Sequence, residues 1–439
     1  MLGRLRPVLR FIGLLCGAVF GAVVVDALLA QVLDNVAEGE AIGFAQDAVE
    51  NQTAVVVPNL SDLVPFWLPE PIVARDGNPI LPPTRYFVDP RNLLGTPVDQ
   101  LPQFDPEIAK AKVMRRTIRE TSLLKPIHHP GDWIIVGGKV YVHRSDDVFS
   151  KKLTTKNRRM LLNLITSVLE NTCARVPDVS FNVAAGAMGT HVRTRPVLAI
   201  ARKTGGERQY FGGILIPNPY FEGIVKWMDL MAKYREKCIA KDRLWKQRAG
   251  QVFWRGALES KKPPSADGNR ERSQAAALSQ SHPDLFSVEL LKDAEPEDYC
   301  KYKFLLNLPG STSGSYSRNL NHLWAMGSVV MQWESEKGYG PNYDEWYYPA
   351  LIPNVTHVEV SVENAAKVTK YLTQRDKVSQ HLSRQALAVY NTLLCPCCLA
   401  EHFVHVFQLI SKQMAFDPRV IIQNFSSKWV RQDALQSER

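Results

Sequence analysis

The 439-residue sequence has no dense run of lysine or arginine, although its formal net charge is +9. Because the basic residues are spread along the chain, a nucleic-acid-binding tail is not expected. Repeats of solenoid length are missing too, and 45% apolar with 22% charged residues excludes a mostly disordered chain. These absences leave a globular protein of about two domains.

Cysteine is scarce, with seven in the whole chain. The densest group is Cys395-Pro396-Cys397-Cys398, which is followed by His402 and His405. Its spacing matches no standard zinc module. We therefore expect a disulfide or buried thiols beside a helix there, and no metal site.

The amino-terminal region lacks charge over residues 11–25, and Arg4, Arg6 and Arg10 precede this apolar segment. A basic segment before an apolar one is the pattern of a secretory signal. The segment is short for a membrane span, but the residues that follow extend it if Asp26 lies at the interface. We favour an uncleaved anchor, since no KDEL-type retrieval signal ends the sequence, and a cleaved signal peptide is the alternative. With the arginines on the cytoplasmic side, the rest of the chain is lumenal.

Four N-glycosylation sequons suit a lumenal location, and they begin at Asn51, Asn59, Asn354 and Asn424. Together with the signal, they predict a single-pass type II protein of the Golgi or endoplasmic reticulum membrane. The amino-terminal helix would be its contact with the membrane, and no nucleic-acid partner is expected.

Composition and periodicity divide the chain into five segments. A Pro-rich stem follows the anchor. Strands then alternate with helices in two successive stretches, which predicts the α/β class with parallel sheets flanked by helices. The expected segments are an anchor at 1–33, a stem at 34–100, α/β domains at 101–250 and 251–385, and helices at 386–439.

Apolar spacing places the individual elements. Helices are expected at 105–122, around 161–169, at about 220–248, at 273–278, at 318–326 and over most of 363–412. Strands are expected at 133–136, 140–142, 179–183, 197–201, 213–216, 252–254, 304–308, 328–332 and 355–360, with the first two joined by a Gly-Gly turn.

Three segments in the second half have the composition of a nucleotide site. Phe253-Trp254-Arg255-Gly256 ends a strand in a glycine turn, at the edge where open α/β sheets bind ligands. The Gly/Ser-rich loop within Leu306–Ser315 offers backbone N–H groups to a phosphate, and Arg318 adds a forked cation. Asp344–Pro349 combines a carboxylate with aromatics suited to a ribose and a base. Taken singly, a tight turn, a helix cap and a surface aromatic cluster are the alternatives.

The order and spacing of these segments resemble glycosyltransferase family 90. This family contains the Rumi-type protein O-glucosyltransferases and the fungal capsule-associated xylosyltransferases. Weaker similarity extends back through Val176–Asp178 and Phe181–Val183, so the resemblance covers about residues 110–410. The matching stretches are Phe253–Gly256, Tyr299–Phe304, the Gly-Ser loop, Gly327–Val330, and Glu345–Pro349 with Pro353 and His357.

The resemblance implies a GT-B fold, in which two Rossmann-like domains face a cleft and the second holds the donor. It also implies a UDP-sugar donor carrying glucose or xylose, a protein or glycan hydroxyl as acceptor, inversion at the anomeric carbon, and no metal or other cofactor. Without a metal, arginines and a helix amino terminus must offset the charge on the departing UDP. By position, the donor-binding residues are Arg255, Gly256, Arg272, Ser313, Gly314, Ser315, Arg318 and Glu345.

The sequence departs from the family at the catalytic base. Shortly after the segment that ends at Val183, the glucosyltransferases have an aspartate that deprotonates the acceptor, whereas Ala185 occupies the aligned position here. Since a general base contributes about 10²–10⁴ in rate, another group must replace it in an active enzyme. His191 is the nearest titratable candidate, although it is also compatible with a core or surface histidine. The other candidates are Glu207 and Glu222.

Two consequences follow from these departures. A protein that keeps the fold but lacks the base would be a non-catalytic nucleotide-sugar or glycan-binding protein, which is the alternative function. In addition, the cysteine that usually partners Cys300, near Ala325-Met326, is missing. Cys300 should therefore pair elsewhere or stay free.

Overall fold

Two β-sheets organise the part of the chain that the computed structural model describes, one of six strands and one of five. The described residues belong to one compact unit, Val73–Arg439. They are residues 101–437 without 123, 125, 147–153, 186–194, 204–212, 222, 241–244, 267, 291–293, 311–318 and 335–342. The predicted anchor and stem, with the sequons at Asn51 and Asn59, lie outside this description.

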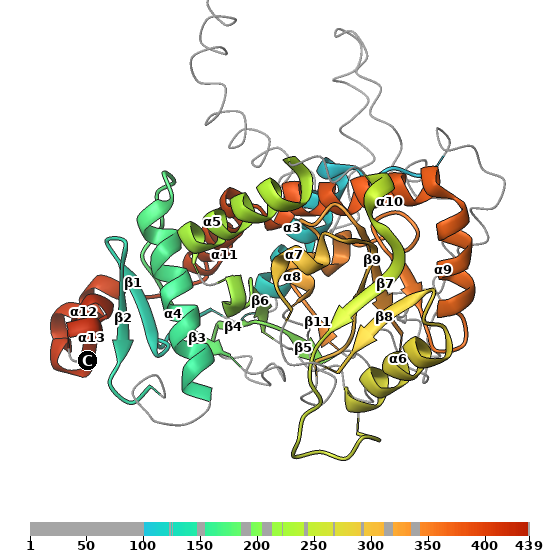
Figure 1. The fold of residues 1–439 in the computed structure, drawn as a ribbon. Helices are drawn as coiled ribbons and strands as arrows, with labels where there is room; N and C mark the ends of the chain where they lie inside the picture. The colour runs from blue at the N-terminus through green and yellow to red at the C-terminus, as the bar shows by residue number, and fades with distance from the viewer. Residues whose placement is uncertain are drawn as a thin grey trace, which may run out of the picture. The chain divides into compact units, whose positions relative to one another are not determined.

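The first sheet has the strand order β13-β2-β1-β3-β4-β6, and Figure 1 labels its strands β2, β1, β3, β4 and β6. Its strands are β1 (Trp133–Val136), β2 (Lys139–His143), β3 (Val179–Ala184), β4 (Val197–Ala199), β6 (Ile214–Leu215) and β13 (Trp429–Arg431). The hairpin of β1 and β2 is confirmed, and its turn residues Gly137 and Gly138 have φ of 56° and 72°. Both turn positions therefore need the positive φ that glycine adopts without strain. From β3 to β6 the pairing is parallel.

Helices cover this sheet where the apolar spacing predicts them. On α4, Leu161, Leu164, Ile165 and Val168 are fully buried. The helices are α3 (Pro106–Ser122), α4 (Thr154–Asn171), α5 (Ile224–Tyr234) and α11 (Pro396–Ser411).

The expectation of one helix from 220 to 248 was wrong. After the 3₁₀ turn η5 (Pro219–Phe221), α5 ends at Tyr234 and continues as the π-helical turn η6 (Arg235–Ala240), and a 3₁₀ turn η7 (Trp245–Gln247) follows. The reason is tertiary. Cys238 forms a disulfide with Cys300, and Arg248 folds back to donate from Nη2 to the Cys238 carbonyl at 2.8 Å. These contacts override the helical preference of the segment.

The second sheet is parallel throughout, in the order β8-β7-β9-β10-β12. Its strands are β7 (Ala249–Arg255), β8 (Phe286–Glu289), β9 (Tyr302–Asn307), β10 (Val329–Trp333) and β12 (Val358–Val360). Its helices are α6 (Asn269–Ser281), α7 (Pro296–Tyr299), α8 (Leu320–Leu323), α9 (Ala365–Gln374) and α10 (Asp376–Val389) (Figure 1). The prediction of the α/β class is confirmed, with a second sheet that is parallel throughout and a first sheet that is parallel from β3 to β6 and antiparallel from β3 to β13.

Two elements here are shorter than expected. The helix predicted over 318–326 is described only as α8, and a turn with Gly327 at φ 63° separates it from β10. The strand predicted over 355–360 begins at Val358, because Asn354 adopts φ 60° and opens a turn closed by the bond from its N–H to the His357 carbonyl.

Two apolar clusters pack on opposite faces of the second sheet. Side chains of alternate residues point to opposite faces of a strand. Trp254 and Leu306 thus join the cluster that includes residues of α6, α9 and α10, whereas Phe253 and Leu305 join the larger cluster that also contains the core of the first sheet. A continuous core therefore connects the two sheets.

A two-stranded ribbon and a buried ion network also join the two halves. In the ribbon, β5 (Arg202–Lys203) pairs with β11 (Tyr343–Asp344). Arg116 is ion-paired with both Asp344 and Glu120, and Arg202 contacts the same carboxylates at 3.2 and 2.7 Å. Burial opposes the charge of Arg116, but the two carboxylates raise its pKa above the ordinary value. We call Arg116, Glu120, Arg202 and Asp344 the buried ion network.

The carboxyl-terminal helices cross from one sheet to the other. α10 packs on β10 of the second sheet, continues through the π-helical turn η9 (Tyr390–Leu394), and is followed by α11, which packs on β3 of the first. Among the described residues, no single helix is long and apolar enough to cross a membrane, and only the pair of 376–394 with 396–411, bent by 45°, passes on length and composition.

Among the described cysteines, disulfides form at two places. The expectation at the Cys395–Cys398 group is met by a disulfide between those two residues, and Cys300 pairs with Cys238 instead of the missing partner. The replacement fits because Cys238 Sγ lies 3.6 Å from the sulfur of Met326, where the usual partner was expected. Cys173 and Cys397 are free and exposed.

Candidate functional site

The strand order of the second sheet places a ligand-binding edge between β7 and β9. In chain order its strands run 2-1-3-4-5 across the sheet, as in doubly wound nucleotide-binding folds. After β7 the chain proceeds to β8 on one side, and then to β9 on the other. Ligands bind such sheets at the carboxyl ends of the two strands where this direction reverses. The loops that begin at Gly256 and Leu308 flank this point.

Arg272, on α6, bridges these two loops. It donates from Nη1 to the carbonyl of Ala257, and from Nε and Nη2 to the carbonyl of Pro309 at 3.2 and 3.1 Å. Its guanidinium also lies 5.2 Å from the ring centre of Trp254, which is 2% exposed. A cation held by two loops therefore lies at the switch point.

Gly256 is needed for this arrangement. A Cβ at this position would lie 2.5 Å from Cζ2 of Trp254, well inside van der Waals contact. Any larger residue must therefore push the indole ring away from its place beneath Arg272. Gly256 and Arg272, predicted together from the sequence, do lie at the same edge.

Arg255 points to the opposite face of β7. Its guanidinium stacks 4.4 Å from the ring centre of Phe253 and bonds to Glu289 at 3.0 Å and to the hydroxyl of Ser287 at 3.1 Å. It also lies near Tyr299, where burial raises the pKa of the phenol to about 12 although the arginine charge opposes this. In this structure Arg255 therefore holds β7 to β8, away from Arg272.

The loop between β7 and α6 is organised by Asn269, which is 1% exposed. Its amide donates to the carbonyls of Glu259, Lys262 and Pro263 at 3.1, 3.2 and 3.3 Å, and its oxygen accepts from the Glu259 N–H at 2.8 Å. This single side chain therefore sets the path of the loop. Sequence reasoning missed it, although an asparagine before an Arg-Glu-Arg helix start was a visible signal.

A row of buried polar side chains crosses the second sheet on the face that carries Phe253 and Arg255, opposite the face of Trp254. Gln332 is the register partner of both Asn307 and Glu359, so the three lie side by side on β9, β10 and β12. Gln332 and Glu359 are each 2% exposed and Asn307 is 8% exposed. Within the described contacts, Oδ1 of Asn307 has no hydrogen-bond partner. A buried acceptor without a partner is rare in native proteins. It lies at the last residue of β9, shortly before the predicted Gly-Ser loop.

Glu345, predicted to bind the donor, is fully buried. Its carboxylate accepts from the Asn218 amide at 2.8 Å and from the Tyr348 hydroxyl at 3.1 Å. Asn218 in turn exchanges hydrogen bonds with Asn321 of α8 at 3.2 and 3.0 Å. In this structure Glu345 thus supports the helix that comes after the Gly-Ser loop. Ser313, Gly314, Ser315 and Arg318 of that loop lie outside the described residues.

The expected position of the family base is also visible. Ala185 directly follows β3 and is 6% exposed, and its carbonyl accepts from the Asn157 amide at 3.3 Å. Tyr220 donates from its hydroxyl to Asn157 at 3.3 Å. An amide therefore contacts the backbone at the position where the family resemblance leads us to expect a carboxylate. His191, Glu207 and Glu222 are not among the described residues.

The two described sequons differ in exposure. Asn354 is 5% exposed, so a glycan on its amide has no room in this fold. Asn424, at the end of α12 (Pro418–Asn424), is exposed. Of the two, Asn424 is the one compatible with a glycan.

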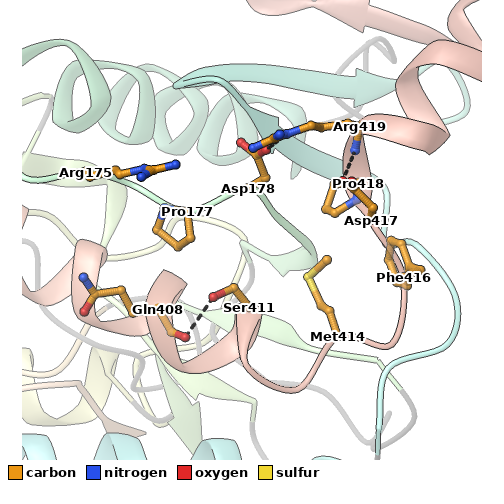
Figure 2. A pocket seen from close by; sticks show the side chains of 10 residues that line it. All are labelled: Arg175, Pro177, Asp178, Gln408, Ser411, Met414, Phe416, Asp417, Pro418 and Arg419. Atoms are coloured by element: carbon orange, nitrogen blue, oxygen red, sulfur yellow. Dashed lines mark hydrogen bonds and ion pairs between the residues drawn. The ribbon is translucent and has the colours of Figure 1, made fainter. Parts of the chain in front are cut away.

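A hollow of about 530 Å³ lies at the other end of β3 from Ala185. Figure 2 shows Asp178 and Arg419, which form an ion pair, at one edge of it, and Met414 and Phe416 further along the lining. Because Asp178 directly precedes β3, the hollow is about 20 Å from the carboxyl edge of that strand. It is not part of the candidate site. Across the residues described, no group of three His, Cys, Asp or Glu side chains could hold a metal ion.

Comparison with known proteins agrees with the resemblance seen in the sequence. Among similar proteins, the human protein O-glucosyltransferase 1 is 26% identical over 189 residues, which is 40% of this chain and 44% of that protein. The O-glucosyltransferase rumi of Drosophila pseudoobscura pseudoobscura is 27% identical over 184 residues, 37% of this chain and 40% of that protein. This chain thus spans less than half the length of the curated relatives it matches, at most 44% in these two.

The match to a family model is more extensive. The model of Glycosyl transferase family 90 covers residues 114–428, which include the second sheet, every strand of the first sheet except β13, the Arg272 bridge and the position of Ala185. The chain therefore belongs to glycosyltransferase family 90.

Proposed function

We propose that this protein is an inverting glycosyltransferase that moves a sugar from a UDP-sugar to a protein or glycan hydroxyl. Glucose or xylose is the proposed sugar, and no metal or other cofactor takes part. We propose a GT-B arrangement, with the donor on the second sheet and the acceptor on the first. The observation that carries the proposal is the Arg272 bridge at the switch point of a parallel sheet, in a member of this family.

Arg272 is the residue that we assign to the diphosphate. Its donors are held by backbone carbonyls of two loops, and a phosphate entering between the loops would replace these neutral acceptors with anionic oxygens, to which the guanidinium can bond with two parallel N–H groups. Stacking on Trp254 keeps the guanidinium plane fixed meanwhile. The positive charge then offsets the negative charge that develops on the departing UDP. In this proposal Ser313, Gly314, Ser315 and Arg318 complete the phosphate site, while Arg255, Gly256 and Glu345 shape and support it.

Calorimetry with UDP in excess EDTA tests the donor site. We expect binding without a divalent ion, and a loss of at least about 1.4 kcal/mol, or tenfold in Kd, for Arg272→Ala. Arg384→Ala is the matched control, because Arg384 is an exposed arginine on α10, outside α6 and the two loops that Arg272 bridges. Binding that appears only with manganese, or an equal loss in both variants, would contradict the proposal.

The acceptor side needs a base that Ala185 cannot supply. We propose His191 for this role, because an imidazole has an ordinary pKa of about 6.5 and can accept a proton near neutral pH. We expect His191→Ala to lower turnover at least about tenfold, as for loss of a general base, and to leave UDP affinity nearly unchanged. Full activity in this variant would move the assignment to Glu207 or Glu222.

The second candidate function is a non-catalytic nucleotide-sugar or glycan-binding protein. It is favoured by one observation, the buried alanine with an amide beside it at the expected base position. A screen of UDP-sugar hydrolysis and transfer with the purified protein separates the two. UDP binding without transfer from any donor would support the binding protein over the enzyme.

We also propose that the protein acts in the lumen of the Golgi or endoplasmic reticulum, held by its amino-terminal anchor. The support is the basic-then-apolar segment at the amino terminus and the exposed sequon at Asn424. Cells that express the full chain should yield a membrane-bound, endoglycosidase-sensitive protein. An unglycosylated protein in the cytosolic fraction would refute this location.

A further inference from the structure

Three cysteines lie at the amino end of α11. Cys395 is the N-cap residue, Cys398 lies within the first turn, and the two form a disulfide. Pro396 takes the first helical position, where its missing N–H leaves no bond unmade. Cys397, between them, is free and exposed. The segment is therefore a C-x-x-C disulfide at the start of a 16-residue helix, with a third thiol beside it.

The hydrogen bonds at the two sulfurs can stabilise the reduced thiols as well as the disulfide. The N–H of Cys398 donates to Cys395 Sγ at 3.1 Å, and the positive end of the helix dipole lies at the same place. Both effects stabilise a thiolate on Cys395. Cys398 Sγ lies 3.5 Å from the Asn391 carbonyl, so a thiol created there has an acceptor in place. Reduction therefore needs no rearrangement to satisfy either sulfur.

The other disulfide provides an internal contrast. Cys238 and Cys300 are 1 and 0% exposed and are 62 residues apart, whereas Cys395 and Cys398 are partly exposed and 3 residues apart. A dissolved thiol can reach the second pair in the folded protein but not the first. The short loop also constrains the unfolded chain less, so its disulfide adds less to stability.

The position of the exposed pair gives its redox state a structural consequence. It lies at the junction where the chain passes from α10 and η9, on the second sheet, to α11, on the first. Just before it, the Leu394 carbonyl accepts from Trp227 Nε1 of α5 at 2.7 Å. The disulfide thus braces the first turn of the helix that completes the core of the first sheet.

We propose that Cys395–Cys398 is a thiol–disulfide exchange site whose co-reactant is a thiol reductant, and that reduction releases this brace. The attacking thiolate bonds to Cys398 Sγ, the S–S bond breaks, and Cys395 leaves as the thiolate that the helix end stabilises. A second thiolate then attacks the sulfur of the reductant in the mixed disulfide, which frees Cys398 and the oxidised reductant. Two thiols thus supply two electrons and two protons, and one disulfide is exchanged for another.

Reduction of the folded, full-length protein in glutathione buffers tests the exchange. After acid quenching, free thiols are alkylated and each cysteine peptide is quantified by mass spectrometry. We expect Cys395 and Cys398 to become labelled at a glutathione concentration at least about tenfold lower than Cys238 and Cys300. A parallel series with dithiothreitol separates a monothiol from a dithiol as the reductant. Resistance of the pair to both reagents until the protein unfolds would overturn the proposal.

Two variants test the order of the steps. With oxidised glutathione, the double variant Cys395→Ser/Cys397→Ser should accumulate a mixed disulfide between Cys398 and glutathione, because neither neighbouring thiol remains to displace the glutathione. Cys397→Ser is the matched control, since it removes the exposed neighbour and leaves the disulfide intact, and its reduction midpoint should equal that of the wild type. If the reduction midpoint of Cys397→Ser moved to the value measured for the unfolded protein, the substitution would have disturbed the whole segment. That result would refute the assignment.

Hydrogen exchange measures the brace itself. In the wild type we expect faster amide exchange in the first turn of α11 after reduction, with unchanged exchange in α9, which lies on the second sheet. Unchanged exchange at both places would refute the coupling of the redox state to this junction.

Discussion

Lowering the pH from 7 to 5 should destabilise this protein through two histidines that fold without charge. His402, on α11, is 8% exposed, donates from Nε2 to the Leu215 carbonyl at 3.1 Å, and packs 4.3 Å from the ring centre of Trp346. Burial, assisted by the charges of His405 and Arg116, lowers the pKa of His402 to about 3. His322, on α8, has an enclosed Nδ1, and burial lowers its pKa to about 4.

The direction of the effect follows from proton uptake. An unfolded imidazole gains a proton below pH of about 6.5, whereas the folded one stays neutral down to about pH 3 or 4. Between these values the unfolded chain binds more protons, so the free energy of unfolding falls as the pH falls. From pH 7 to 5, each histidine should remove about 2 kcal/mol, since each pH unit below 6.5 is worth about 1.4 kcal/mol. Little is lost above pH 7.

Urea unfolding followed by tryptophan fluorescence at pH 7, 6 and 5 measures this loss. His402→Gln keeps an N–H near the Leu215 carbonyl but cannot titrate. We expect the variant to be less stable at pH 7 and to lose about 2 kcal/mol less than the wild type on going to pH 5. His129→Gln, at an exposed histidine, is the control and should follow the wild type. An identical pH dependence of the wild type and His402→Gln would refute the reasoning.

Three further predictions concern other parts of the fold. Gly256→Ala should lower the free energy of unfolding by about 1–3 kcal/mol in urea titrations and weaken UDP binding, because its Cβ displaces Trp254. Arg116→Ala should lower the free energy of unfolding by about 3–5 kcal/mol, because two buried carboxylates lose a partner. A change of less than about 0.5 kcal/mol would show that the buried ion network does not stabilise the fold. Asn424→Gln should remove one endoglycosidase-sensitive band shift, whereas Asn354→Gln should leave the glycan pattern unchanged, and the reverse result would contradict the burial of Asn354.

The strands and helices with strong local patterns could be predicted from the sequence. The hairpin around Gly137-Gly138, the strand β3 and the helix α4 each carry their own turn or apolar spacing. The strand β8 was missed because Phe286-Ser287-Val288-Glu289 alternates over too few residues to be distinguished from a loop. The break after α5 was missed because its cause is a disulfide partner 62 residues away.

The candidate site could be predicted in part. The glycine turn and the arginine of α6 were expected at one edge, and the structure brings Gly256 and Arg272 together there. Arg255 lies on the other face because neighbouring residues of a strand alternate, a rule that sequence reasoning could have applied. The row containing Asn307 could not be foreseen, since it depends on the register of three strands that are distant in sequence.

The pairing of β13 with β2 affects how the protein can fold during synthesis. In this antiparallel pair Val430 lies opposite Val142, although the two residues are far apart in the sequence. The ribosome therefore synthesises every strand of the second sheet after β2 and before β13. Until β13 leaves the ribosome, the outer edge of β2 has open N–H and carbonyl groups, which invite pairing with other chains. A nascent chain that leaves the ribosome without β13 would therefore have a folded hairpin whose β2 edge is unpaired and prone to aggregation. Chaperones that bind exposed strand edges should then matter most late in synthesis, after the second sheet has already formed.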